Sequence, residues 1–205
     1  TDEITGLAAA FATMVAVHSR VGQVVDVSLI ESLFQFMSPL ATLYALTGEM
    51  QPRMGAGLPY TVPRGTYRCA DGEWVGISTS SDSVAARVLN LLGVGGDERF
   101  TTFAARMAHR EELEALMRAW CAARTRPEVM DAFEAAEAAI GPVMDMAQIA
   151  ADPHYAARGA IVELDGTPMQ GLLAKLSATP GELRWQGRPM NADGDTIREK
   201  GWNDD

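Results

Sequence analysis

A carboxylate stands at the beginning of a long apolar stretch of this sequence. Asp2 precedes Gly6 in the pattern Asp-x-x-x-Gly, and residues 3–18 are mostly small or apolar. An ionised carboxylate can act as a covalent nucleophile. A helix N-terminus would stabilise that anion and offer backbone N–H groups to a developing oxyanion. Because a lone Asp at a helix start is usually only a cap, Asp2 is a candidate nucleophile only if the rest of the sequence supports that role.

A second candidate is the glycine pair Gly55 and Gly57, which follows Arg53. Glycine lets backbone N–H groups approach a reacting carbonyl and lets a loop open and close. The segment is short, and a plain linker explains it equally well. It does not match a dinucleotide-binding motif, because the third glycine and the preceding strand are missing.

The other titratable residues favour structural roles. Asp26 and Glu31 lie near each other but within an expected strand and helix start, where we interpret them as scaffold. The histidines and cysteines have no partner at metal-ligand spacing, and two cysteines are too few for a disulfide framework: His18, His109, His154, Cys69 and Cys121. We therefore expect no metal site and two reduced thiols.

Composition restricts the class of protein. The 205 residues are 47% hydrophobic and 21% charged, with a formal net charge of −10. That acidity argues against a nucleic-acid partner, which needs a basic face. The apolar run at residues 7–17 is too short to span a bilayer and lacks the basic flank of a signal peptide. We expect a cytoplasmic α/β enzyme or binding protein with no membrane association.

Periodicity predicts two apolar helices before a loop. Residues 3–18 form a helix that is apolar on nearly every side and is therefore expected to be buried. Residues 23–28 predict a short buried strand, and residues 29–45 a second helix. Residues 49–63 contain Pro and Gly without periodicity and predict a loop.

The middle of the chain predicts a small α/β lobe. Residues 66–69 and 73–78 flank Asp71-Gly72 and predict a hairpin. Helical patterns follow at residues 82–92, 101–108, 110–123 and 126–138. Beyond them the sequence predicts a short helix that stops at Asp152-Pro153, a hairpin at residues 160–173 and a weak helix at residues 194–200.

Several landmarks, taken in order, resemble the class III CoA-transferase family (CaiB/BaiF type). They are Asp-x-x-x-Gly at 2–6, GQVVDVSLIE at 22–31, Arg-x-Gly with its glycine loop at 53–57, YRCADGEWV at 67–75, GPV at 141–143, DP at 152–153, KLSATP at 175–180 and PMNADGDT at 189–196. Each is weak alone, whereas the ordered set covers almost the whole chain.

The resemblance implies a partial fold. Family members are much longer, and their first half is a Rossmann-like region that binds much of the CoA. We expect residues 1–48 to end the first large-domain segment, 49–63 to form the linker and glycine loop, 64–145 the small α/β domain, and 146–205 the return to the large domain. The resemblance also implies an interlocked homodimer.

The resemblance further implies a chemistry for Asp2. The matching carboxylate attacks an acyl-CoA thioester and forms first a mixed anhydride and then an aspartyl-CoA thioester, which a carboxylic acid turns over. Gly55 and Gly57 match a loop that shields the intermediate, although this chain has fewer glycines there. Coenzyme A enters as the thioester substrate, and no tightly bound cofactor is expected.

Two alternatives stay open. An α-methylacyl-CoA racemase shares the fold but deprotonates the α-carbon with a His and an acidic residue. Its acid would fall near Ser80 to Asp82, where serine stands at the matching position. The other alternative is a non-catalytic fragment that needs a separate N-terminal half.

Overall fold

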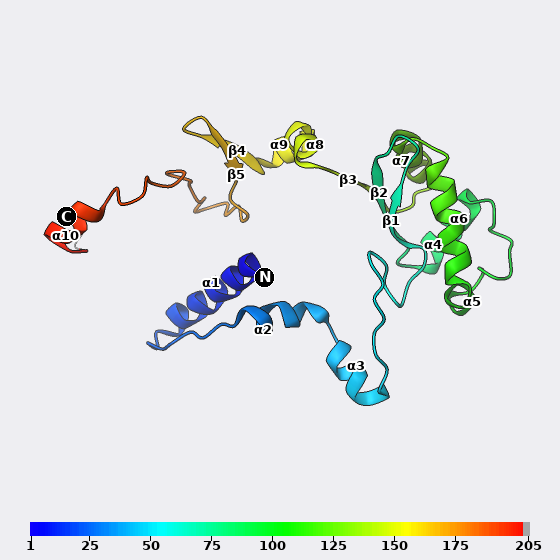
Figure 1. Ribbon diagram of the computed structural model, residues 1–205, viewed down its shortest axis with the longest axis horizontal. Coiled ribbons are helices and arrows are strands. Elements are labelled where there is room, and N and C mark those ends of the chain that lie inside the picture. Colours follow the sequence, from blue (N-terminus) through cyan, green and yellow to red (C-terminus); the bar gives the residue numbers. More distant parts are fainter. Residues whose placement is uncertain (203–205) are drawn as a thin grey trace. The chain divides into compact units, whose positions relative to one another are not determined.

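The computed structural model describes residues 1–202. Contacts divide the chain into two compact units, residues 1–61 and the remainder from Val62 onward, and the ribbon follows the elements of each (Figure 1).

The first unit contains α1 (Asp2–Ser19), α2 (Leu29–Phe34), the 3₁₀ helix η1 (Gln35–Met37) and α3 (Leu40–Thr47). The prediction of a single helix over 29–45 was wrong, because the chain breaks at Ser38, whose φ is 56°. The next residue, Pro39, lacks an N–H and disfavours helical geometry in the residue before it.

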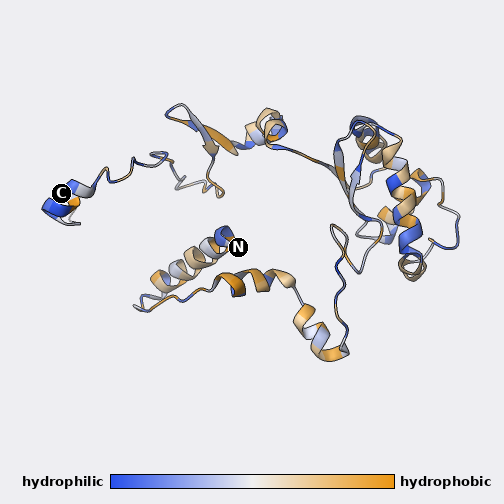
Figure 2. Cartoon of the chain, viewed as in Figure 1, coloured by the Kyte–Doolittle hydropathy of each residue, from blue (hydrophilic) through white to orange (hydrophobic). Residues whose placement is uncertain are grey.

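Two further expectations for the first unit were wrong. Residues 23–28 form no strand; within the described residues they pair with no neighbouring strand, and a strand exists only as part of a ladder. Helix α1 contains no buried residue, and no apolar side chain of residues 1–61 is buried. Phe11 is 73% exposed and Val24 91% exposed, and apolar colour covers much of α1 and α2 (Figure 2).

The second unit is built on an antiparallel sheet with strand order β1-β2-β3. Strands β1 (Arg64–Arg68) and β2 (Trp74–Ser78) form the predicted hairpin. Gly72 takes the positive φ of 86° that its turn requires. The third strand, β3 (Ile140–Val143), was not predicted; it pairs Gly141 with Gly76 of β2.

Four helices predicted for this unit were confirmed: α4 (Asp82–Leu91), α5 (Phe103–Ala108), α6 (Arg110–Ala122) and α7 (Arg126–Ala135). The Ser81 hydroxyl caps α4 by accepting from the Val84 N–H. The core joins the inner side of the sheet to the helices and includes Tyr67, Val75, Ile77, Val88, Met117, Cys121, Val129 and Phe133.

After β3 the chain forms α8 (Met146–Ala151), α9 (Pro153–Arg158), the hairpin β4 (Ile161–Leu164) and β5 (Thr167–Gln170), and α10 (Gly194–Lys200). The predicted end of a short helix at Asp152 was confirmed, whereas α9 was not predicted. The Asp152 carboxylate accepts from the N–H groups of His154 and Tyr155, which starts α9 directly behind α8. The second hairpin and the last helix were confirmed.

Among the described residues, no single helix is both long and apolar enough to cross a membrane; the segments Leu29–Met37 and Leu40–Thr47, bent by 66°, meet that test only as a pair. Within the same residues no cluster of His, Cys, Asp and Glu can hold a metal ion.

The Phe133 side chain should dominate the stability of the second unit. It is fully buried and packs edge-on against Trp120. Phe133→Ala is expected to lower the free energy of unfolding by about 3–5 kcal/mol. Phe103→Ala, at a half-exposed position, should cost less than about 1 kcal/mol. Urea denaturation of both variants checks this, and equal effects would mean that the core lies elsewhere.

Stability should also fall in alkaline solution. Burial raises the pKa of the Cys121 thiol from 9.0 to about 12. Between these pH values the thiol loses its proton in the unfolded chain but keeps it in the folded one. The contribution of the buried thiol to the free energy of unfolding is therefore fully present below pH 9 and is lost towards pH 12. Urea midpoints measured between pH 8 and 11 should therefore decrease, and less steeply in Cys121→Ala. An unchanged slope would place the titration elsewhere.

Candidate functional site

Asp2 is the first residue of α1 and is exposed to solvent. The Thr1 hydroxyl donates to Asp2 Oδ1 at 3.0 Å. The first helical hydrogen bond joins the Thr5 N–H to the Thr1 carbonyl at 2.9 Å, and no side chain caps the helix start. The first-turn N–H groups thus have no helical acceptor, and the helix dipole favours a negative charge at this end of α1.

Gly6 lies one helical turn after Asp2 on the same side of α1. A Cβ atom placed on Gly6 would meet nothing within 4 Å. Gly6 therefore leaves open the space beside the Asp2 side chain on this side of the helix.

The opposite side of α1 borders a cavity of about 490 Å³. Its lining combines apolar side chains of α1 with residues 26–36: Ile4, Leu7, Ala8, Phe11, Asp26, Val27, Ser28, Glu31, Ser32, Gln35 and Phe36. The structure brings Asp26 and Glu31 to one cavity but does not bring Asp2 to it. At 3.6 residues per turn, Asp2 faces roughly away from Ile4 and Phe11.

Gly55 and Gly57 belong to a tight turn. The Gly57 N–H donates to the Met54 carbonyl at 3.0 Å, and Gly55 has a φ of 61°. Positive φ at the first central position of a turn is the conformation that glycine adopts without strain. This glycine loop therefore has a defined backbone geometry that an L-residue would disturb at Gly55.

Asp82, the acidic residue after the first hairpin, is held in an ion pair. Its Oδ1 accepts from Arg106 Nη2 at 2.5 Å, and the Arg106 side chain is almost completely buried. Arg106 Nη1 also donates to the Phe100 carbonyl at 3.3 Å. The pair joins the start of α4 to α5, which is a structural role.

A polar cluster that the sequence did not reveal fixes the exit from β3. Arg126 Nη1 donates to Glu73 Oε2 at 2.7 Å and to Gln148 Oε1 at 3.2 Å. Gln148 Nε2 donates to the same Glu73 oxygen at 3.1 Å. These contacts join α7, the first hairpin and α8 although the residues lie far apart in the sequence.

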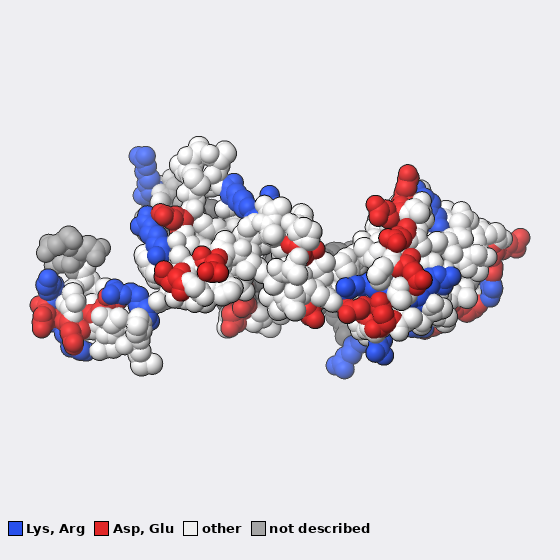
Figure 3. Space-filling view, turned by 90° about the horizontal axis from the view of Figure 1, so that it is seen from above, with Lys and Arg blue, Asp and Glu red and all other residues white. Residues whose placement is uncertain are grey.

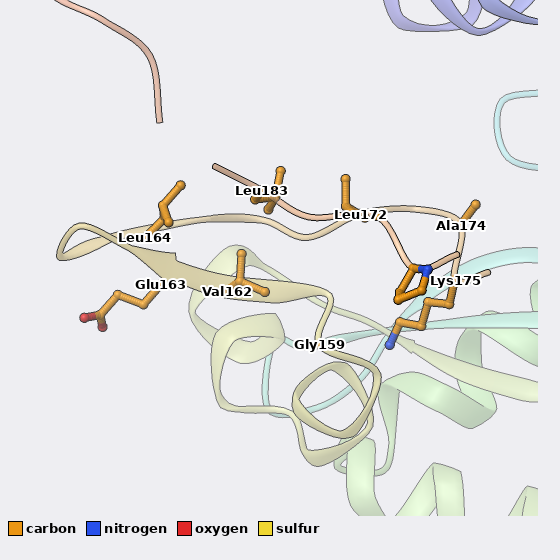
Figure 4. Close-up of a pocket in the computed structure, with 10 residues that line it drawn as sticks. Gly159, Val162, Glu163, Leu164, Leu172, Ala174, Lys175 and Leu183 are labelled. Carbon is orange, nitrogen blue, oxygen red and sulfur yellow. The ribbon is translucent and has the colours of Figure 1, made fainter. Parts of the chain in front are cut away.

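A second cavity, of about 410 Å³, lies between the β4–β5 hairpin and the segment that follows it. Figure 4 shows Val162, Leu172 and Leu183 gathered there, with the Glu163 carboxylate directed away from Lys175. The Lys175 ammonium donates to the Arg158 carbonyl. Lys175 belongs to the KLSATP landmark, but nothing in the sequence indicated that it borders a cavity.

The remaining sequence candidates show no catalytic arrangement. His109 Nδ1 lies 2.8 Å from Glu112 Oε1 on the surface, and His18 lies in the last turn of α1. Both cysteines are buried, and burial raises the pKa of Cys69 as it does that of Cys121. They are protonated thiols at neutral pH rather than nucleophiles.

Comparisons with known proteins agree on one family. The model of CoA-transferase family III matches residues 1–194. Succinyl-CoA–D-citramalate CoA-transferase from Chloroflexus aurantiacus is 32% identical over 198 residues, covering 91% of this chain and 49% of that protein. Succinate–glutarate CoA-transferase from Agrobacterium fabrum is 27% identical over 177 residues, 83% of this chain and 44% of that protein.

The fold agrees as well. A CaiB/BaiF family protein from Brucella suis superposes with a TM-score of 0.77 at 27% identity, over 96% of this chain and 54% of that structure. The chain thus spans about half the length of the relatives it matches. The mixed α/β class expected from the sequence is confirmed. From the family model, the identities and the superposition, the chain belongs to CoA-transferase family III.

Proposed function

We propose that the protein transfers coenzyme A between an acyl-CoA and a carboxylic acid, with Asp2 as the nucleophile. The observation that carries the proposal is the position of Asp2. It is an exposed carboxylate at an uncapped helix start, beside the open space at Gly6, within the matched family region.

In the proposed first step a carboxylate oxygen of Asp2 attacks the thioester carbonyl carbon. The tetrahedral oxyanion accepts hydrogen bonds from first-turn N–H groups of α1. Cleavage of the C–S bond expels CoA thiolate and leaves a mixed anhydride. The thiolate then attacks the aspartyl carbonyl, which releases the donor acid and leaves CoA on Asp2 as a thioester.

The second half of the cycle runs through the same steps in reverse order. The acceptor carboxylate attacks the aspartyl thioester and expels CoA thiolate, giving a second anhydride. Attack of the thiolate on the acceptor carbonyl forms the new acyl-CoA and frees the Asp2 carboxylate. No net proton transfer or redox step is needed, so the cycle requires neither a metal nor a bound cofactor.

For the substrate class we propose small dicarboxylic acids. The names of similar proteins include citramalate, malate, glutarate and oxalate as acids, and succinyl-CoA as a thioester. Succinyl-CoA is therefore the first donor to test. We leave the acceptor to a panel of such acids.

We further propose that other polypeptide surface covers the first unit. None of its apolar side chains is buried within this chain, and exposed apolar area of this extent marks an interface. We propose a homodimer. Two similar proteins are named as α and β subunits of one transferase, so a second type of subunit is the alternative occupant. Without such a partner, the chain would correspond to the non-catalytic fragment that the sequence leaves open as an alternative.

The racemase alternative receives less support. It needs an acidic residue free to exchange a proton near Ser80 to Asp82. Asp82 instead pairs with the buried Arg106 guanidinium, and Ser81 caps α4. Neither group is arranged as a general base.

Trapping with hydroxylamine tests the nucleophile. Incubation with succinyl-CoA and hydroxylamine should convert Asp2 into a hydroxamate, detected by peptide mass spectrometry. Asp2→Asn should lower the transfer rate by at least about 1,000-fold, because removing a covalent nucleophile eliminates the pathway. Glu3→Gln, which removes the neighbouring first-turn carboxylate, is the matched control and should retain most activity.

An active enzyme whose Asp2 stays unmodified would contradict the assignment. Exchange of the substrate α-proton with solvent, without transfer of CoA between acids, would establish the racemase instead.

The glycine loop gives a separate test. Gly55→Ala places a Cβ where φ is 61°, which strains the turn by about 1–2 kcal/mol. If the loop closes over the intermediate, kcat/KM should fall about tenfold. Gly57→Ala, at a position without positive φ, is the control. Thermal unfolding distinguishes a catalytic loop from a plain linker, since strain in a linker would change the melting temperature without changing kcat/KM.

A further inference from the structure

The β1–β2–β3 sheet has one face covered by helices and one face without a covering element in its own core. Tyr67, Val75 and Ile77 point to the helices and are buried. Since side chains alternate along a strand, the register places the other set on the second face, here called the outer face. It consists of Arg64, Thr66, Arg68, Trp74, Gly76, Ser78, Gly141 and Val143.

The outer face is arranged in cross-strand rows. One row is Arg68, Trp74 and Val143, in which the indole is 44% exposed. The next row is Thr66, Gly76 and Gly141, and Arg64 pairs with Ser78 beyond it. A Cβ on Gly141 would meet nothing within 4 Å. Bare backbone therefore separates an exposed aromatic ring from a second arginine.

The outer face is cationic in an acidic protein. Neither the Arg64 nor the Arg68 guanidinium forms an ion pair with a carboxylate among residues 1–202; Arg68 Nε donates only to the Gly72 carbonyl at 3.4 Å. The nearby acids Asp71 and Glu73 bond Arg126 instead. Elsewhere on this unit, acidic and basic side chains are interspersed (Figure 3). With a net charge of −10, a polyanion needs such a local cationic face to approach.

The size of the outer face suits a small molecule better than a protein. Three strands at about 4.8 Å spacing and five residues at about 3.3 Å each give roughly 14 by 16 Å, or about 230 Å². A specific protein interface needs about 800 Å² per partner. A planar base with its phosphates fits the smaller area.

We propose that the outer face binds the phosphorylated nucleotide end of the CoA thioester. The Arg64 and Arg68 guanidinium groups bind phosphate oxygens, the Trp74 indole stacks on the adenine, and the glycine row lets the base lie against the backbone. The inference rests on the proposed CoA-transferase function and names a substrate-binding surface for it.

Titration of the purified protein with CoA, 3′,5′-ADP and pantetheine, by calorimetry and tryptophan fluorescence, tests the proposal. Arg64→Gln with Arg68→Gln should raise the Kd for CoA and 3′,5′-ADP by about tenfold per arginine and leave pantetheine binding unchanged. Trp74→Phe should remove most of the fluorescence change. Arg118→Gln, an exposed arginine of α6, makes the same charge change on the helical side and should have little effect.

Unchanged nucleotide affinity in the double variant overturns the inference, as does an equal loss in Arg118→Gln. So does a change of oligomeric state in light scattering without a change of affinity, which would assign the outer face to a protein partner. The two proposals fail separately. Labelling of Asp2 with arginine-independent CoA affinity overturns only the nucleotide surface, whereas arginine-dependent affinity without labelling overturns only the nucleophile.

Discussion

Burial of apolar side chains against the inner side of the β1–β2–β3 sheet is the interaction on which the second unit depends. Val75 and Ile77 of β2 meet Met117, Val129 and Phe133 from α6 and α7. This single layer of helices on one face leaves the other face of the sheet to its polar, aromatic and glycine residues. The arrangement of the core thus decides which side chains of β1 and β2 are buried and which lie on the other face.

Polar contacts then fix the elements that hydrophobic burial only brings together. Glu114 of α6 accepts from the Tyr67 hydroxyl at 2.8 Å and from the Arg64 N–H at 3.2 Å, which sets α6 against β1. Burial, together with the Glu114 carboxylate, raises the pKa of Tyr67, so the phenol donates throughout the physiological range. The Glu73–Arg126–Gln148 cluster has the same function where β3 leaves the sheet.

The first unit has the opposite character. Its helices carry many apolar side chains and bury none of them, whereas the start of α1 presents an exposed carboxylate. Burial of such surface is the main favourable term in folding, so this unit needs surface from elsewhere to be stable. For the nucleophile proposed at Asp2, such a cover would exclude water and strengthen the hydrogen bonds to an oxyanion.

The sequence by itself determined both hairpins, four helices of the second unit and the family. Asp71-Gly72 and Asp165-Gly166 marked both hairpins, and the periodicity of residues 82–135 marked four helices, because turn chemistry and amphipathic patterns act over a few residues. The ordered landmarks from Asp2 to Thr196 identified the CoA-transferase resemblance. Only the tertiary structure decided the rest. The addition of β3 to the sheet, the Asp82–Arg106 pair and the cavity between α1 and residues 26–36 all join separate segments of the chain. Such contacts depend on how the whole chain packs, which local sequence patterns do not record. The apolar pattern of α1 likewise indicated that its side chains need to be buried, but not which surface would bury them.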